Sequence, residues 1–242
     1  MPASHYESCR TRISFVKIFL SLNERPANNF GIAFIVAILM ATGTGILILV
    51  LGKNGTFQLI NSNHNEIADQ FFKYFTHYGD GLMWAPLGLY CYFYRRKYFI
   101  AVVAGVIIST IIAQFLKRVV YPDELRPISY LSEIFPVHVI DGVTMRKVHS
   151  FPSGHTTTAF AMALIMAYII NRKIWSVILP VLALLAGYSR VYLGQHFPTD
   201  IFAGMCIGIL SAILSLLVYR KFIRYLNKKE LIKPQVVSPE KS

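Results

Sequence analysis

The sequence predicts an all-α protein, a six-span transmembrane helical bundle, and three observations support that fold class. Only 15% of the 242 residues are charged, whereas soluble domains average about 25%. The mean hydropathy is +0.49, and apolar runs long enough for a helix to cross a bilayer recur along the chain. Clusters of basic residues separate several of these runs, as in membrane proteins whose positive loops face the cytoplasm.

Six apolar runs are the predicted spans. The first begins behind too polar a leading segment to be a secretory signal peptide, and the second is short and rich in aromatic residues. Arg95, Arg96 and Lys97 separate the second run from the third, and Arg172 and Lys173 separate the fourth from the fifth. In chain order the runs cover residues 30–51, 81–94, 98–116, 154–170, 174–188 and 200–219.

An even number of spans places both termini on one side of the membrane, and the basic residues indicate which side. Sixteen of the 24 lysines and arginines lie on the side of the termini, and such residues concentrate in the cytoplasm. We therefore expect the outward-facing loops to be 52–80, 117–153 and 189–200. The first of these has four aromatic residues around Lys73, which fits either an interfacial amphipathic helix or a plain loop.

The length of the chain suits one domain. We expect a cytoplasmic N-terminal tail (1–29), a six-span membrane domain (30–220) and a basic cytoplasmic C-terminal tail (221–242). The short loops favour a bacterial inner membrane, with the outward loops in the periplasm. Basic cytoplasmic loops explain the net charge of +12, so the sequence does not indicate nucleic-acid binding, which would need a soluble basic face.

One outward segment, residues 149–155, leads directly into the fourth predicted span. Ser153 is a good N-cap, and Gly154 leaves the backbone open to a ligand. The start of a helix offers unpaired N–H groups and the positive end of its dipole, which together favour an anion. His155 lies within the first turn and can face the same anion. The alternative interpretation is a capped helix with an interfacial histidine.

A second outward segment, residues 189–200, leads into the sixth predicted span. Asp200 follows His196 by four residues, and Pro198 suits the first turn of a helix. At that spacing a carboxylate can hold one imidazole nitrogen and leave the other as an acceptor or nucleophile. Arg190 can present a planar fork to phosphate oxygens. The alternative is a polar turn at the membrane surface.

Further charges lie on the same predicted face. Lys117 and Arg126 add two cations, which taken singly are equally typical of solvated side chains. Asp80 follows a glycine turn at the start of the second span; it either helps to shape the pocket or hold a cation, or is an acid favoured by a helix N-terminus. Three basic residues, an amide cradle and two histidines on one membrane face suit a phosphate that is attacked and released.

At these residues the sequence resembles the type 2 phosphatidic acid phosphatase superfamily of lipid phosphate phosphatases. The pattern of that family is K-x6-R-P, then P-S-G-H, then S-R-x5-H-x3-D. The second and third motifs are present in full, at residues 152–155 and 189–200. The first departs from the pattern, because eight residues separate Lys117 from Arg126, and Arg118 is the alternative first-motif cation. The resemblance covers about residues 80–220.

The resemblance implies a role for each motif residue. His196 would be the nucleophile that forms a phosphohistidine, and Asp200 would orient it. His155 would donate a proton to the leaving oxygen and later activate water. The residues implied in binding the phosphoryl oxygens are Lys117, Arg126, Ser153, Gly154 and Arg190. Cations would replace the metal used by other phosphoryl-transfer enzymes, so we expect neither a metal nor a cofactor.

The predicted function is hydrolysis of a phosphate ester or diphosphate on a membrane lipid, with the active site on the exocytoplasmic side. The candidate substrates are undecaprenyl diphosphate, phosphatidylglycerophosphate, phosphatidic acid and the phosphates of lipid A, and the sequence assigns no oligomeric state. The alternative function is a membrane anion transporter or channel without hydrolytic activity, which the scarcity of ionisable residues within the spans disfavours. A hydrolase with a metal on His149, His155 and His196 lacks the H-E-x-x-H motif.

Overall fold

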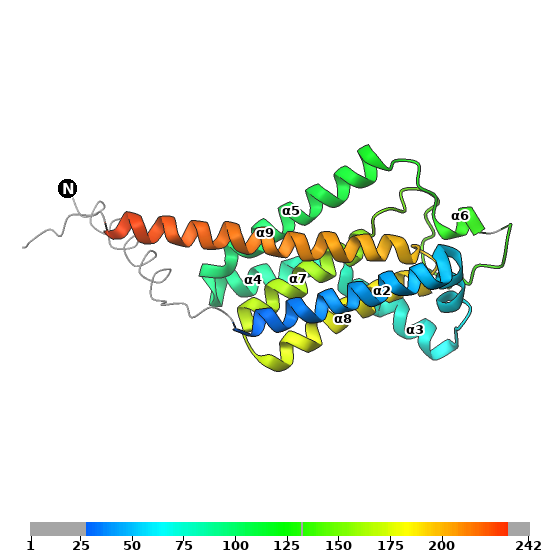
Figure 1. The fold of residues 1–242 in the computed structure, drawn as a ribbon, viewed down its shortest axis with the longest axis horizontal. Coiled ribbons are helices and arrows are strands. Elements are labelled where there is room, and N and C mark those ends of the chain that lie inside the picture. Colours follow the sequence, from blue (N-terminus) through cyan, green and yellow to red (C-terminus); the bar gives the residue numbers. More distant parts are fainter. Residues whose placement is uncertain (1–27, 132, 232–242) are drawn as a thin grey trace, which may run out of the picture.

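The computed structural model describes residues 28–131 and 133–231, and every regular element within those ranges is a helix (Figure 1). The all-α prediction is therefore confirmed. The predicted N-terminal tail lies outside the described residues as far as residue 27, and so do the last eleven residues of the predicted C-terminal tail. The longer helices run along one axis and form an elongated bundle.

The elements follow one another in a simple order. The α-helices are α2 (Asn28–Asn61), α3 (Glu66–Phe75), α4 (Trp84–Tyr94), α5 (Phe99–Phe115), α6 (Pro127–Leu131), α7 (Gly154–Ile170), α8 (Lys173–Tyr192) and α9 (Pro198–Leu231). Short 3₁₀ turns η1 (Thr76–Gly79), η2 (Gly81–Met83) and η3 (Arg96–Tyr98) precede α4 and α5, and a π-helical turn, η4 (Leu116–Val120), follows α5.

Four helical segments are long and apolar enough to cross a membrane: Asn29–Asn61, Arg96–Val120, Lys173–Tyr192 and Pro198–Lys228. The fourth predicted span corresponds to α7, an apolar helix of 17 residues, and the second to α4, which has 11. Both are shorter than the roughly 20 residues that a bilayer requires of an untilted helix. The chain is an integral membrane protein of helices, and a count of six spans stays a prediction.

Helix α7 lies at the centre of the bundle and packs against α2, α5, α8 and α9. It is apolar on all sides, which is the pattern of a helix surrounded by protein, and most of its side chains are buried. Gly204 lets α9 approach it closely, because a Cβ there would lie 2.8 Å from the carbonyl oxygen of Ser153 and 2.9 Å from Cβ of Thr156. Small residues at such positions are typical of packed membrane helices.

Helices α7 and α9 both begin at the same end of the bundle, where α5 and α8 end (Figure 1). The positive ends of two helix dipoles therefore point toward one region of the molecule. At the opposite end, α9 continues to Leu231, so residues 221–231, predicted to begin a tail, extend this helix.

The aromatic segment near Lys73 forms the short helix α3, which agrees with the first of the two sequence interpretations. Asn65 caps this helix, its Oδ1 accepting a hydrogen bond of 2.9 Å from the N–H of Ala68. Phe72 packs against the rings of Tyr188 and Tyr192 on α8. The helix is thereby fixed beside the end of the bundle where α7 and α9 begin, and its location at a membrane interface stays a prediction.

Candidate active site

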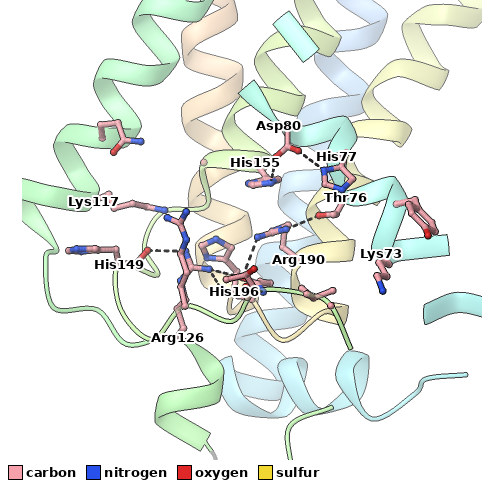
Figure 2. Close-up of a pocket in the computed structure, with 18 of the residues that line it drawn as sticks. Lys73, Thr76, His77, Asp80, Lys117, Arg126, His149, His155, Arg190 and His196 are labelled. Carbon is pink, nitrogen blue, oxygen red and sulfur yellow. Dashed lines mark hydrogen bonds and ion pairs between the residues drawn. The ribbon is translucent and has the colours of Figure 1, made fainter. Parts of the chain in front are cut away.

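A pocket of about 670 Å³ opens at the end of the bundle where α7 and α9 begin (Figure 2). Six of the eight predicted site residues line it: Lys117, Arg126, Gly154, His155, Arg190 and His196. The other two, Ser153 and Asp200, are buried behind its wall. Residues separated by up to 83 positions in the sequence are thus brought together at one site.

His196 and Asp200 form a buried carboxylate–imidazole pair. Nδ1 of His196 lies 3.1 Å from Oδ2 of Asp200, and the two residues are 1% and 2% exposed. The same carboxylate oxygen accepts hydrogen bonds from the N–H of Phe197 (3.0 Å) and the hydroxyl of Ser150 (2.5 Å). A proton on Nδ1 satisfies this arrangement and leaves the lone pair of Nε2 available. The sequence interpretation had not identified Ser150.

The environment keeps His196 neutral. Burial, together with the positive charges of Arg126 and Lys117, holds the pKa of His196 well below its ordinary value. A neutral imidazole is the form that attacks phosphorus, so the cations that would bind a phosphoryl group also prepare the nucleophile.

Arg126 is held rigidly, with 4% of its surface exposed. Its guanidinium donates to the backbone oxygen of Val148 at 3.1 Å and to the backbone and side-chain oxygens of Gln195 at 2.8 and 3.1 Å. Burial lowers the pKa of Arg126 to about 10, so the side chain stays charged at neutral pH. With a further bond of 3.4 Å to the backbone oxygen of His149, four hydrogen bonds set the direction in which this charge faces the pocket.

Arg190 approaches the same point from the end of α8. It donates to the hydroxyl of Thr76 at 2.8 Å and to Oε1 of Gln195 at 3.4 Å. Its Nε is buried and has no hydrogen-bond partner among the described residues, so this N–H is an unsatisfied donor beside the pocket. Gln195, which the sequence interpretation had overlooked, holds both arginines through a single carbonyl oxygen.

Gly194 makes the turn that follows α8. Its φ of +65° lies in the left-handed region that glycine adopts without strain. The backbone N–H groups of Gln195 and His196 then both donate to the carbonyl of Arg190, at 2.9 and 3.2 Å. This turn fixes the spacing between the cation on α8 and the imidazole that precedes α9.

The structure favours Lys117 over Arg118 as the first-motif cation. Both side chains line the pocket, but Lys117 is the less exposed and its charge acts on the pKa of His196. Arg118 is exposed, and its Nε donates to Oε1 of Gln114 at 3.0 Å. The π-helical turn Leu116–Val120 carries one residue more per turn than an α-helix. This wide turn and the loop after it accommodate the longer spacing to Arg126.

Ser153 and Gly154 start α7 as the sequence predicted, but they differ in what they offer the pocket. The hydroxyl oxygen of Ser153 accepts hydrogen bonds from the N–H and hydroxyl of Thr156, at 3.4 and 3.0 Å. Ser153 is fully buried and does not line the pocket, because capping draws its side chain into the protein. Gly154 lines the pocket, and nothing lies within 4 Å of the position a Cβ would take. The backbone, rather than Ser153, is therefore exposed to an anion.

Of the two interpretations of Asp80, the structure favours the one in which it helps to shape the pocket, because its side chain lines it. Its side chain makes no cap hydrogen bond to η2 and instead joins two histidines (Figure 2). Oδ1 lies 2.6 Å from Nε2 of His155, and Oδ2 lies 2.6 Å from Nδ1 of His77. The hydrogen bond from His155, opposed in part by burial, lowers the pKa of Asp80 to about 2. Gly79 permits this contact, because a Cβ there would lie 2.9 Å from Cβ of His155.

The pocket therefore contains two carboxylate–imidazole pairs and a group of cations. Asp200 holds His196 through Nδ1, and Asp80 holds His155 through Nε2. Both imidazoles face the cations that line the pocket (Figure 2). Fixed cations and helix N-termini around a neutral histidine suit the binding and attack of a phosphoryl group.

His149, His155 and His196, the ligands of the metal-dependent alternative, do not form a metal-binding group among the described residues. Among residues 28–131 and 133–231, only His64, Asp69 and His138 bring three ligand atoms close enough to hold an ion. None of these three lines the pocket.

Comparisons with known proteins agree with this chemistry. The model of a family described as the PAP2 superfamily matches residues 98–224, a segment that includes all eight predicted site residues. An undecaprenyl-diphosphatase of Sulfolobus acidocaldarius is 28% identical over 162 residues, which cover 66% of this chain and 74% of that protein. A lipid A 4'-phosphatase of Porphyromonas gingivalis is 28% identical over 168 residues, covering 65% and 69%.

Two solved structures have similar folds. The crystal structure of Aquifex aeolicus LpxE has a TM-score of 0.59 at 31% identity, covering 66% of this chain and 92% of that one. A PAP2-type phosphatidylglycerolphosphate phosphatase from Bacillus subtilis has a TM-score of 0.54 at 21% identity, covering 86% and 98%. The second likeness extends the shared transmembrane fold over most of the present chain.

Proposed function

Because this chain belongs to the PAP2 superfamily, we propose that its pocket hydrolyses a phosphate ester or diphosphate of a lipid head group through a phosphohistidine on His196. Family membership and the phosphatase relatives make the chain a membrane lipid phosphatase that works without a metal. No finding supports an anion transporter or channel. The observation that carries the proposed mechanism is the buried, neutral His196, held through Nδ1 by Asp200 among fixed cations.

In the first step, Nε2 of His196 attacks phosphorus while the bond from phosphorus to the lipid oxygen breaks. His155 gives its proton to that oxygen, so the lipid leaves as an alcohol or as a lipid phosphate. Its Nε2 is held by Asp80, which leaves Nδ1 as the nitrogen that exchanges the proton. General acid catalysis of this kind contributes about 10²–10⁴-fold to a rate.

In the second step, a water molecule attacks phosphorus and the phosphorus–nitrogen bond breaks. His155 takes a proton from the water, inorganic phosphate leaves, and His196 returns to its neutral form. Lys117, Arg126 and Arg190 remain around the phosphoryl oxygens in both steps. At 4 Å, each such pair of charges is worth about 4 kcal/mol at an effective dielectric constant near 20.

The lipid tail has a place to lie beside this site. An apolar groove of about 420 Å³ runs between α4 and α7 and is lined by Tyr78, Met83, Leu87, Tyr90, Met162 and Met166, among others. Tyr78 is two residues from Asp80, so one end of the groove is close to the pocket. We infer that the substrate enters sideways from the bilayer.

We further propose that the membrane is a bacterial inner membrane, with both termini in the cytoplasm and the pocket in the periplasm. The basic turns at Arg95–Lys97 and Arg172–Lys173 lie at the end of the bundle away from the pocket, which supports this orientation. The candidate substrates are undecaprenyl diphosphate, phosphatidylglycerophosphate, phosphatidic acid and a lipid A phosphate. The phosphorylated lipid and the bilayer are the expected partners, and no nucleic acid is expected.

The test is a phosphate-release panel over these lipids, with the purified protein in detergent and EDTA present. One lipid should be hydrolysed at least tenfold faster than the rest, and His196→Ala should release no phosphate although its thermal unfolding is unchanged. A radiolabelled aryl phosphate should leave an acid-labile, alkali-stable label on His155→Ala protein and none on His196→Ala protein. A folded, active His196→Ala variant would remove His196 as nucleophile.

A further inference from the structure

Outside the pocket, two histidines and an aspartate from three separate segments lie together. His64 belongs to the connection after α2, Asp69 to α3, and His138 to the loop between α6 and α7. One ligand atom from each of the three lies within 4.8 Å of the others. This cluster plays no part in the proposed hydrolysis, since none of its members lines the pocket.

One pair of atoms in the cluster already has the spacing of two ligands on one ion. Nε2 of His138 lies 3.1 Å from Oδ1 of Asp69. Zinc–nitrogen and zinc–oxygen bonds of about 2.0–2.2 Å place neighbouring ligand atoms of a tetrahedral site roughly 3.3 Å apart. The ring of His64 stacks on that of His138, with centroids 3.6 Å apart and planes 2° from parallel. The stacking brings a second imidazole beside the same carboxylate, and a turn of the exposed His64 ring out of the stack would direct both in-plane lone pairs at one ion.

Hydrogen bonds hold the cluster in place from behind. The hydroxyl of Tyr192 donates to Oδ1 of Asp69 at 2.5 Å. Asn61 fixes the backbone of His138 on both sides: it accepts from the N–H at 2.8 Å and donates to the carbonyl oxygen at 3.1 Å. Hydrogen-bond partners of this kind orient metal ligands and strengthen metal binding. These hydrogen bonds join protein groups to one another, so they do not depend on the ion.

We propose that His64, Asp69 and His138 bind one divalent transition-metal ion, of which Zn²⁺ is the probe of choice. Two imidazoles and one carboxylate suit Zn²⁺ and its first-row neighbours, whereas Mg²⁺ and Ca²⁺ prefer oxygen ligands. The three side chains leave a fourth position for water.

The ion would fasten the outer wall of the active-site pocket. The loop that carries His138 continues into Gly142, Val143, Thr144 and Arg146, which line the pocket. Lys73 on α3 already donates to the carbonyl oxygen of Asp141 at 2.6 Å. Joining His138 to α3 and to the connection after α2 would anchor this loop at a second point, so the ion is structural and takes no part in the chemistry.

The experiment uses full-length protein in detergent, without a polyhistidine tag, after removal of metals with EDTA and dialysis. Zn²⁺ should bind at one ion per chain, measured by elemental analysis after desalting. At 100-fold excess over its dissociation constant it should raise Tm by about 5–10 °C. His64→Gln, at an exposed position, should fold normally and lose both effects. Glu66→Gln is the matched control, because it removes an exposed carboxylate two residues from His64. This variant should keep both the bound zinc and the rise in Tm.

Two results would overturn the proposal. One is an equal zinc content in wild type and His64→Gln, and the other is an equal rise of Tm with Mg²⁺. Either would make the cluster a hydrogen-bonded contact only. Because phosphate release in EDTA tests the hydrolytic site separately, failure of one proposal leaves the other standing.

Discussion

Replacing Asp80 with asparagine tests the contact that the tertiary structure adds to the motif residues. The change keeps the size of the side chain but removes the charge that holds His155 and His77 at 2.6 Å each. A hydrogen bond to a charged group contributes about 1.5–3 kcal/mol. If the bond to His155 is fully used in the transition state, its loss lowers kcat by about 10–150-fold at 1.36 kcal/mol per tenfold. KM should change less than threefold, because Asp80 does not bind phosphate.

The assay compares a lipid phosphate with an aryl phosphate whose leaving group needs no proton. In single turnover, Asp80→Asn should slow phosphorylation of His196 by the lipid far more than by the aryl ester. The pKa of Asp80, about 2, means that its charge is lost only as the pH falls through 2, so wild-type activity near neutral pH does not reflect its titration. The alkaline limb of the pH–rate profile for phosphorylation, which reports loss of the proton that His155 donates, should instead move to lower pH in the variant.

Asp123→Asn is the matched control, because Asp123 is exposed and does not line the pocket. It should change neither kcat nor the pH profile. If folded Asp80→Asn keeps kcat within threefold of wild type for both substrates, Asp80 does not position His155 and the reasoning fails.

Three further predictions follow from other contacts. Lys117→Gln should lower kcat/KM at least 30-fold and Arg118→Gln less than threefold in phosphate-release assays, and the reverse order would reassign the first motif. In the folded protein His196 is buried and neutral, because its pKa lies well below its ordinary value. In the unfolded chain the pKa of His196 is ordinary, so below it the unfolded chain binds a proton that the folded protein does not. Stability should therefore fall as the pH drops below about 6.5, by up to about 1.4 kcal/mol per pH unit, and His196→Gln should show a shallower fall in Tm. Gly204→Ala should cost about 1–3 kcal/mol through overpacking against α7, whereas Gly31→Ala, with nothing within 4 Å, should not lower Tm; equal Tm values for the two variants would contradict the close packing.

Local spacing made part of the site predictable. His196 and Asp200 are four residues apart at the start of a helix, and the pairing of Nδ1 with Oδ2 follows from that spacing. The N-cap at Ser153 was predictable for the same reason. The burial of the Ser153 side chain was not predictable, because it depends on the chain that packs over this residue. One such contact is the hydrogen bond of 3.0 Å from the N–H of Ser153 to the carbonyl oxygen of Asp200.

Contacts between distant segments gave no signal in the sequence. Asp80 and His155 are 75 residues apart, and only the approach of Gly79 to α7 brings them together. The bridge of Gln195 between two arginines depends likewise on the path of the loop before α6, which carries Arg126. His64 and His138 had no usable spacing, since their stacking joins parts of the chain that periodicity does not relate.

The sequence by itself determined that this protein is a helical membrane protein with the motifs of a lipid phosphatase. Apolar runs, basic turns and i, i+4 pairs are set by residues close in the chain, so they can be read in order. Only the tertiary structure decided which groups surround the two histidines, that the charge of Lys117 acts on His196, and that Asp80 holds His155. Those outcomes depend on how the helices pack against one another, and packing relates residues without regard to their separation in the chain.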